Sequence, residues 1–212
     1  MADLRAIADA VKAGRRKNVI ALVNEAVADG VSAESILNDA LVVGMLELGE
    51  MFKNNEVYVP EVLIAARAMK SGMEIIKPML QAENVQMLGT VAIGTVKGDL
   101  HDIGKNLVGM MLEGAGFNVI DLGVDVGPEQ YIECIRNNDV QIIGMSALLT
   151  TTMVSMREII EALKEAGLRD KVKVMIGGAP ITQEYADEIG ADGYSVDAAS
   201  AAELAKRLVS ES

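Results

Sequence analysis

Several side-chain types are scarce in this 212-residue chain, and the scarcity excludes whole classes of site. The chain contains a single cysteine, Cys134, and a single histidine, His101. One thiol cannot form an internal disulfide or a multi-thiolate metal site, and one imidazole cannot build a multi-histidine site. Any metal bound here must therefore receive most of its ligands from something other than the protein.

Long apolar runs and positive charge are also scarce. No run approaches the roughly 18 apolar residues of a membrane span, and the first twenty residues mix charges among apolar positions, unlike a signal peptide. We therefore expect a cytoplasmic protein with no membrane partner. The formal charge of −12 argues against binding to nucleic acid through phosphate neutralisation.

Half of the residues are hydrophobic and 24% are charged, which is the composition of a folded chain. In the first eighty residues the apolar side chains recur at three- and four-residue spacing, which indicates amphipathic helices. The predicted helices lie at about 2–13, 16–29, 33–53 and 60–80, with Ser32 as a candidate N-cap. Four helices joined by short connections favour a bundle.

From about residue 88, short apolar runs alternate with helical stretches. Five strands are predicted, in "GTVAIGTV", "NVIDLG", "VQIIGMS", "VKVMIGG" and "DGYSV". This alternation is typical of a doubly wound α/β fold, here a Rossmann-like (flavodoxin-like) parallel sheet with strand order 2-1-3-4-5. We expect a helical domain over 1–85 and an α/β domain over 86–212, with the linker at 81–88.

The segment around the only histidine follows the first predicted strand, where a doubly wound sheet places its ligands. Its glycines Gly94, Gly98 and Gly104 lack the spacing of a dinucleotide fingerprint, and no Gly-Lys-Ser/Thr occurs. What remains is an Asp-x-His-x-x-Gly pattern that begins with Asp99 and His101. An imidazole that ligates a metal through one nitrogen needs its other N–H oriented by an acceptor, and Asp99 is placed for that role.

A plainer interpretation is that His101 is an ordinary loop histidine beside a helix-capping aspartate. Two further features favour a site. Ser146 ends the third predicted strand, which should neighbour the first, so that it can reach Asp99 or His101. The fourth strand ends in Gly177–Gly178, which allows a bulky ligand to approach closely, although a glycine pair is also typical of a turn.

Three short patterns occur in a fixed order on the α/β half: Asp99-x-His101-x-x-Gly104, Ser146-x-Leu148 and Gly177-Gly178. Together they resemble the cobalamin-binding domain shared by methionine synthase and the corrinoid proteins. The helical segment "VVGMLELGEMFKNNEVYVPEVLIAARAM" looks like the helical cap of the methyl-carrying branch. The resemblance covers nearly the whole chain and points to the small corrinoid methyl-carrier proteins of methylamine and methanol methyltransferase systems.

The resemblance implies a cobalamin or related corrinoid as cofactor, with His101 as the axial cobalt ligand. Asp99 would accept the second N–H of the ring, and Ser146 would complete a relay to solvent. Gly104 would let the helix start pack against the nucleotide tail of the cofactor. Further cofactor contacts are implied at Leu148, Thr150, Gly177, Gly178, Tyr194 and Ala198. Because the corrin supplies four equatorial nitrogens, one protein histidine suffices for such a metal site.

The implied function is to carry a methyl group on cobalt, between methylcobalamin and cobalt(I) states. The group would pass from a substrate-specific corrinoid methyltransferase to a second methyltransferase, and from there to tetrahydrofolate or another acceptor. The helical half would shield the upper face of the corrin as a cap. We expect a non-catalytic carrier subunit, because the chain shows no substrate domain and no second acid–base cluster. A reductive activase is a further expected partner.

Two alternatives use the same cofactor. The cobalamin subunit of a radical mutase shares the Asp-x-His-x-x-Gly pattern but resembles the α/β half without this helical cap. A cobalamin-dependent sensor or regulator can share both halves, but it usually adds a DNA-binding module, and no basic patch is visible here. The methyl donor stays open among methylamines, methanol, betaines and methoxylated aromatics, because donor choice belongs to the partner enzyme.

Overall fold

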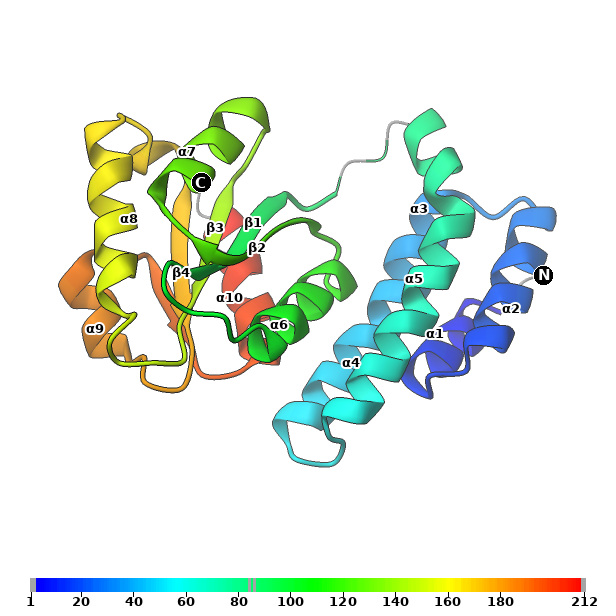
Figure 1. Ribbon diagram of the computed structural model, residues 1–212. Helices are drawn as coiled ribbons and strands as arrows, with labels where there is room; N and C mark the ends of the chain where they lie inside the picture. Colours follow the sequence, from blue (N-terminus) through cyan, green and yellow to red (C-terminus); the bar gives the residue numbers. More distant parts are fainter. Residues whose placement is uncertain (1–2, 84, 86, 211–212) are drawn as a thin grey trace. The chain divides into compact units, whose positions relative to one another are not determined.

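A computed structural model of the chain describes residues 3–83, 85 and 87–210. The chain divides into two compact units. The first comprises the described residues up to Met87 together with Glu113–Gly116, and the second comprises Leu88–Leu112 and the described residues from Phe117 onward. Figure 1 shows that the first unit is built from helices alone and the second around a sheet. Within the described residues, no helix has the length and apolar character that crossing a membrane requires.

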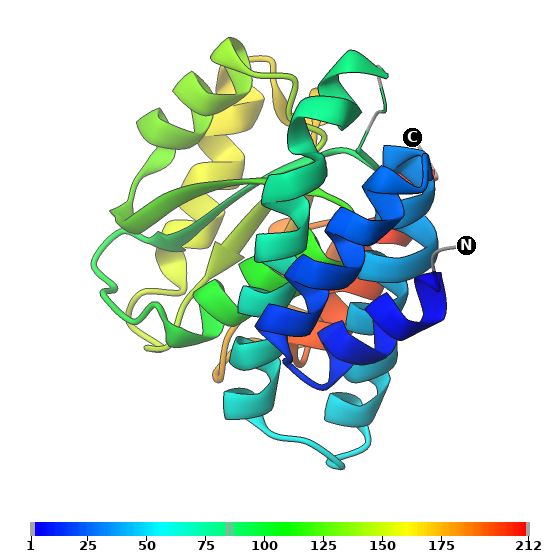
Figure 2. The ribbon, with the colours of Figure 1, turned by 90° about the vertical axis from the view of Figure 1, so that its right-hand side faces the viewer.

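The helical unit has four helical segments, as predicted, because its third segment passes without a break through α3, a π-helical turn and α4. The elements are α1 (Leu4–Lys12), α2 (Arg16–Ala28), α3 (Ala33–Ile36), η1 (Leu37–Leu41), α4 (Val42–Lys53) and α5 (Val59–Ala82). Ser32 caps α3 as predicted, since its hydroxyl accepts from the Ser35 amide at 3.2 Å. Figures 1 and 2 show α4 and α5 side by side, joined by the loop of residues 54–58.

The α/β unit confirms the predicted doubly wound fold. Its strands are all parallel and lie in the order β2-β1-β3-β4-β5. They are β1 (Thr90–Val96), β2 (Asn118–Val126), β3 (Ile142–Ser146), β4 (Lys173–Gly177) and β5 (Gly193–Ser195). The connecting elements are α6 (Ile103–Gly114), α7 (Pro128–Asn137), α8 (Val154–Glu165), η2 (Arg169–Lys171), α9 (Gln183–Ile189) and α10 (Ala198–Ser210). In Figure 1, α7, α8 and α9 cover one face of the sheet and α6 and α10 cover the other.

The core of the α/β unit lies between the sheet and α7, α8 and α9. Strand β1 is buried from Val91 to Val96, as expected for a strand covered on both faces. Tyr131 of α7 is fully buried, and its hydroxyl lies 3.2 Å from the Gly94 carbonyl and 3.0 Å from the Gly144 carbonyl. A side chain at Gly94 would meet that hydroxyl, since an added Cβ would lie 2.8 Å from it. Tyr131 therefore joins β1 and β3 just before the ends from which the site is built.

Replacing Tyr131 by Phe tests this link. The substitution leaves the Gly94 and Gly144 carbonyls without their side-chain donor in a buried place, so we expect a loss of about 1–2 kcal/mol in the free energy of unfolding. Urea unfolding of the full chain measures the loss. The matched control is Tyr58→Phe, because the Tyr58 side chain is largely exposed, and it should leave the midpoint unchanged. Equal effects of the two substitutions would contradict the role of Tyr131.

Candidate functional site

The predicted site residues gather where the parallel strands end, which we call the carboxyl edge of the sheet. The loop of residues 97–102 connects β1 to α6, and we call it the His101 loop. It turns at Gly98, whose φ of 82° suits glycine. Asp99 has no exposed surface, whereas 53% of the His101 side chain is exposed. The loop therefore places a buried acid beneath an accessible imidazole.

The Asp99 carboxylate is surrounded by hydrogen-bond donors. Its Oδ1 accepts from the His101 amide at 3.0 Å and lies 2.7 Å from His101 Nδ1. Its Oδ2 accepts from the amides of Leu148 and Leu149 and from Thr152 Oγ1, at 2.8, 3.3 and 2.9 Å. Burial by itself raises the pKa of Asp99, but the bonds from Leu148, His101 and Thr152 outweigh it and hold the pKa well below its ordinary value.

This ionised carboxylate fixes the state of the His101 ring. A carboxylate without a proton can only accept, so the proton between the two groups belongs to Nδ1 of the imidazole. In the neutral ring the other nitrogen, Nε2, then carries a lone pair. A ring held through Nδ1 by an acidic partner is the arrangement that metal-binding histidines use. The structure thus brings Asp99 and His101 together as the sequence predicts.

The expected contact between Ser146 and Asp99 is not formed, and Thr152 takes its place. Ser146 is not among the donors to Asp99 within the described residues. The Thr152 side chain is 7% exposed, and its hydroxyl bonds both Asp99 and the Leu149 carbonyl, each at 2.9 Å. The reason is the path of the chain after β3, which turns through residues 147–153 and folds back over Asp99. A run of three threonines ending at Thr152 is the only sequence signal that marked this position.

Four small residues form a row across the carboxyl edge. Thr95 of β1 pairs with Ser146 of β3, Ser146 with Gly177 of β4, and Gly177 with Ser195 of β5. Next to the row, Gly178 has a φ of 131° and passes so close to Ala147 that a Cβ would lie 1.9 Å from its carbonyl oxygen. Ser195, which sequence reasoning missed, belongs to this row. The row leaves little side-chain bulk above four neighbouring strands.

The remaining predicted residues lie at the same edge with different exposure. Thr150 is exposed, and Ala198 is buried at the start of α10. Gly104 lies in the first turn of α6, where an added Cβ would meet no atom within 4 Å. Tyr194 is one residue before the row and packs against the core cluster of the unit. The structure therefore does not place the Tyr194 ring in the row.

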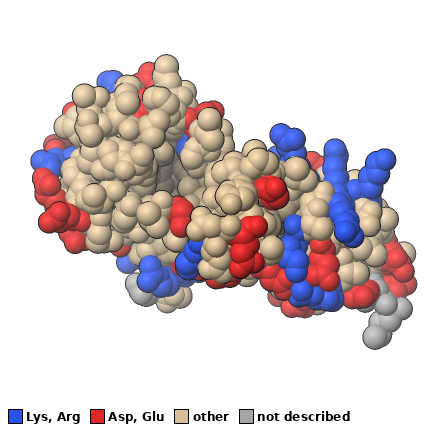
Figure 3. Space-filling model, turned by 90° about the horizontal axis from the view of Figure 1, so that it is seen from below, with Lys and Arg blue, Asp and Glu red and all other residues tan. Residues whose placement is uncertain are grey.

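Exposed apolar side chains lie along the same edge, in or next to the loops that follow β1, β3 and β5. We call them the apolar rim: Leu100, Ile103, Leu148, Leu149 and Val196, which are 71, 78, 44, 42 and 76% exposed. The loops that follow the strands lie on the lower side of Figure 1, and the view from below in Figure 3 shows mostly uncharged side chains on the α/β unit. Such a surface around one polar ring suits a large ligand that is mainly apolar.

A metal at His101 would need its other ligands from outside the chain. Across residues 3–83, 85 and 87–210, no group of three or more His, Cys, Asp and Glu side chains is placed to hold a metal ion. A macrocycle that brings its own equatorial nitrogens meets this condition, and the apolar rim and the small-residue row leave room for its plane and its tail. The residues present therefore fit a corrinoid.

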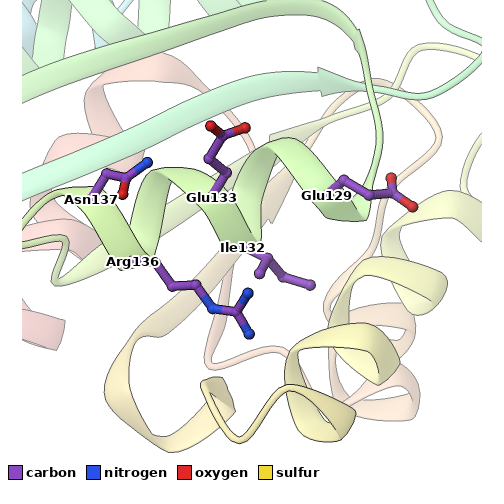
Figure 4. A pocket seen from close by; sticks show the side chains of 5 residues that line it. All are labelled: Glu129, Ile132, Glu133, Arg136 and Asn137. Atoms are coloured by element: carbon purple, nitrogen blue, oxygen red, sulfur yellow. The ribbon is translucent and has the colours of Figure 1, made fainter.

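A groove on α7 lies outside this constellation. Figure 4 shows its lining, which consists of Glu129, Ile132, Glu133, Arg136 and Asn137. All five residues come from one helix, and none belongs to the His101 loop or to a strand end. We assign the groove no part in the site.

Comparison with known proteins agrees with this geometry. Over 206 residues the chain is 44% identical to dimethylamine corrinoid protein 3 of Methanosarcina acetivorans, which covers 97% of this chain and 96% of the relative. Residues 89–203 match the family model of the B12 binding domain, and residues 3–77 match a second model with the same description. The chain belongs to the B12-binding corrinoid proteins. A further member, the trimethylamine corrinoid protein of Methanosarcina barkeri, is 48% identical over 84% of this chain and 82% of its own.

Solved structures of corrinoid proteins share the fold over the whole length. A cobalamin-binding protein from Desulfitobacterium hafniense has a TM-score of 0.82 and 33% identity, covering 98% of this chain and 99% of the other. The methanol:cobalamin methyltransferase complex MtaBC of Methanosarcina barkeri has a TM-score of 0.86 and 30% identity, covering 99% of this chain and 80% of the matched chain. The cofactor that the sequence predicts, cobalamin or a related corrinoid, is thus the one that the family binds.

The buried carboxylate makes the stability of this corrinoid protein depend on pH. Asp99→Asn should lose about 2–3 kcal/mol at neutral pH, because the amide presents donors where the carboxylate accepts. The folded pKa of Asp99 lies below its ordinary value of 3.8. The stabilisation by the carboxylate is therefore fully present above pH 4 and is lost as the pH falls toward the folded pKa.

Urea unfolding at several pH values measures this effect, and the gap between wild type and Asp99→Asn should shrink below about pH 4. The matched control is Asp102→Asn, because Asp102 is exposed and its carboxylate accepts from the Asn106 side chain at 3.0 Å. It should cost about 0.5 kcal/mol or less. A gap for Asp99→Asn that stays constant from pH 7 to pH 3 would contradict the assignment.

Proposed function

We propose that this corrinoid protein carries a methyl group between two methyltransferases, on a bound corrinoid whose cobalt accepts and donates the group. The observation that carries the proposal is the accessible His101 ring, held through Nδ1 by the buried and ionised Asp99. The other predicted contacts at the carboxyl edge are uncharged residues, unlike the acid–base groups of a complete enzyme. The chain therefore provides a holder for the cofactor and leaves substrate activation to its partners.

Each part of the site has its own task in this proposal. His101 offers Nε2 as the axial ligand, while Asp99 keeps the proton on Nδ1 and Thr152 steadies the carboxylate. The small-residue row and Gly178 receive the tail of the cofactor. The apolar rim excludes water around the ring. We assign 86–212 as the cobalamin-binding domain and 1–85 as a helical cap that shields the reactive metal.

The relatives favour a methylated amine as the methyl donor. The corrinoid proteins with 42 to 48% identity are named for dimethylamine and trimethylamine, whereas the methanol complex shares 30% identity. We propose an amine-specific corrinoid methyltransferase as the first partner. A second methyltransferase would pass the methyl group to tetrahydrofolate or another acceptor, and a reductive activase would restore the reduced cofactor.

A transfer experiment tests the carrier role and the donor class together. The full chain, loaded with cobalamin and reduced, is mixed with isotope-labelled trimethylamine, dimethylamine, monomethylamine or methanol, each with and without the methyltransferase specific for it. We expect label on the carrier only when an amine-specific enzyme is present, measured after gel filtration. Label acquired only from the methanol enzyme would contradict the donor class. Sustained demethylation by the chain alone would contradict the carrier role.

The axial ligand is tested by spectroscopy. His101→Ala should fold and still bind cobalamin, although more weakly, because the small-residue row and the apolar rim remain. In the cobalt(II) state, electron paramagnetic resonance of wild type should show splitting by an axial nitrogen, and His101→Ala should lose it. Labelling with 15N-histidine assigns the nitrogen without ambiguity, since the chain has one histidine. Splitting that is unchanged in His101→Ala with the cofactor's own base excluded by isotope labelling, or splitting in wild type that is insensitive to the histidine label, would show that His101 is not the ligand.

A further inference from the structure

The His101 loop is held from two sides. On one side, the loop after β3 binds the Asp99 side chain through Leu148, Leu149 and Thr152. On the other side, Asp125 of β2 binds the main chain: its amide donates to the Asp99 carbonyl at 3.1 Å, and its carboxylate accepts from the Gly98 amide at 2.7 Å. Asp125 therefore holds two peptide groups of the loop ahead of the histidine, Lys97–Gly98 and Asp99–Leu100. It lies 26 residues after Asp99 and belongs to none of the motifs that the sequence marks.

The backbone at Asp125 is unusual. Its φ is 55°, and Asn55 is the only other non-glycine residue with positive φ within the described part of the chain. The left-handed conformation costs roughly 1–2 kcal/mol for an ordinary residue. Aspartate tolerates it because its short side chain can bond locally, and here the side chain bonds the Gly98 amide. A strained conformation persists where surrounding contacts determine it, and such positions cluster at functional sites.

The strand register explains how Asp125 reaches the loop. Gly94 of β1 pairs with Gly123 of β2, and Val96 pairs with Val126. One residue of β1 therefore faces two residues of β2, Val124 and Asp125, which is a β-bulge. Bulges redirect a side chain and often lie next to active sites. Here the extra residue turns the amide and carboxylate of Asp125 toward the His101 loop.

We propose that Asp125 is a positioning residue for His101. By holding the peptides of Gly98 and Asp99, it keeps the Asp99 carboxylate where it accepts a hydrogen bond from Nδ1–H and where Nε2 stays free to ligate. Thr95 supports the same loop at its far end, since its hydroxyl donates to the His101 carbonyl at 2.9 Å. The proposed effect on the ring rests only on the hydrogen bonds of this structure. The effect on cobalt ligation rests, in addition, on the proposed function.

Three substitutions of the full chain separate the contributions of Asp125. Asp125→Asn keeps an acceptor oxygen and tolerates positive φ, but it removes the charge. Asp125→Gly removes the acceptor while glycine accepts the conformation without strain. Asp125→Ala removes the acceptor and adds the strain of a positive φ. Because asparagine and glycine both suit the backbone, a difference between those two variants reports on the side-chain hydrogen bond and not on folding.

The first measurement uses the protein without cofactor. In the chain labelled with 15N-histidine, His101 gives the only ring signals, and the shifts of its two nitrogens at a pH where the ring is neutral report which nitrogen carries the proton. We expect the proton on Nδ1 in wild type and in Asp125→Asn. In Asp125→Gly and Asp125→Ala, we expect loss of this preference, with both shifts moved toward those of a free histidine. Backbone amide spectra confirm that the remaining residues keep their fold.

Unchanged ring shifts in Asp125→Gly and Asp125→Ala would overturn the proposal. So would Asp125→Asn matching Asp125→Gly, because charge and not the acceptor would then govern the ring. If glycine and alanine variants fail to fold, then Asp125 is structural beyond the loop and the proposal fails as well. The wild-type shifts serve as the internal reference for every variant.

The second measurement uses the cobalamin-loaded protein and separates this proposal from the proposed function. Substitutions that disturb the partner of a metal-ligating histidine commonly weaken metal affinity by roughly 10- to 100-fold. We expect Asp125→Gly to raise the dissociation constant of cobalamin by about tenfold, measured by visible titration, and Asp125→Asn to restore it. If wild type lacks a histidine nitrogen on cobalt, the proposed ligation by His101 fails while the ring shifts still decide the role of Asp125. Equal dissociation constants for wild type and Asp125→Gly, with ligation present, would contradict the proposal.

Discussion

The Asp99 carboxylate is buried at the carboxyl edge of the sheet, and the conformation of the surrounding loops depends on it. A buried charge without partners costs several kcal/mol, so the chain must bring donors to both oxygens. The His101 amide and ring donate hydrogen bonds to one oxygen, and the loop after β3 donates to the other. Because these donors come from separate loops, satisfying one carboxylate fixes the position of both. The orientation of His101 is therefore a consequence of where the charged Asp99 carboxylate finds its hydrogen-bond donors.

This arrangement explains why one histidine suffices. A corrin occupies four coordination positions of its metal, so the protein has to supply a single nitrogen with a defined proton state. Asp99 defines that state by accepting from Nδ1. The small-residue row and the apolar rim contribute shape and not charge.

The sheet contributes more than a platform. The β-bulge in β2 turns Asp125 toward the peptides of Gly98 and Asp99, while Tyr131 joins β1 and β3 directly below. The His101 loop is thus held by β1, through Thr95, by β2, through Asp125, and by the loop after β3. Such support keeps an exposed ring in one orientation while its partners approach, which a free loop would not do.

The sequence by itself determined the features that depend on local spacing. Apolar periodicity predicted the helical half and the alternating strands and helices, and the nearly all-apolar strands implied a parallel sheet, whose order 2-1-3-4-5 the structure confirms. Asp99 and His101 were predictable as a pair because only Leu100 separates them. Tertiary structure decided the partners that come from elsewhere: Thr152 where Ser146 was expected, Ser195 beside Tyr194, and Asp125. Strand register and loop path set these contacts, and a shift of one residue exchanges the side chain that faces the site, so no pattern along the chain could specify them.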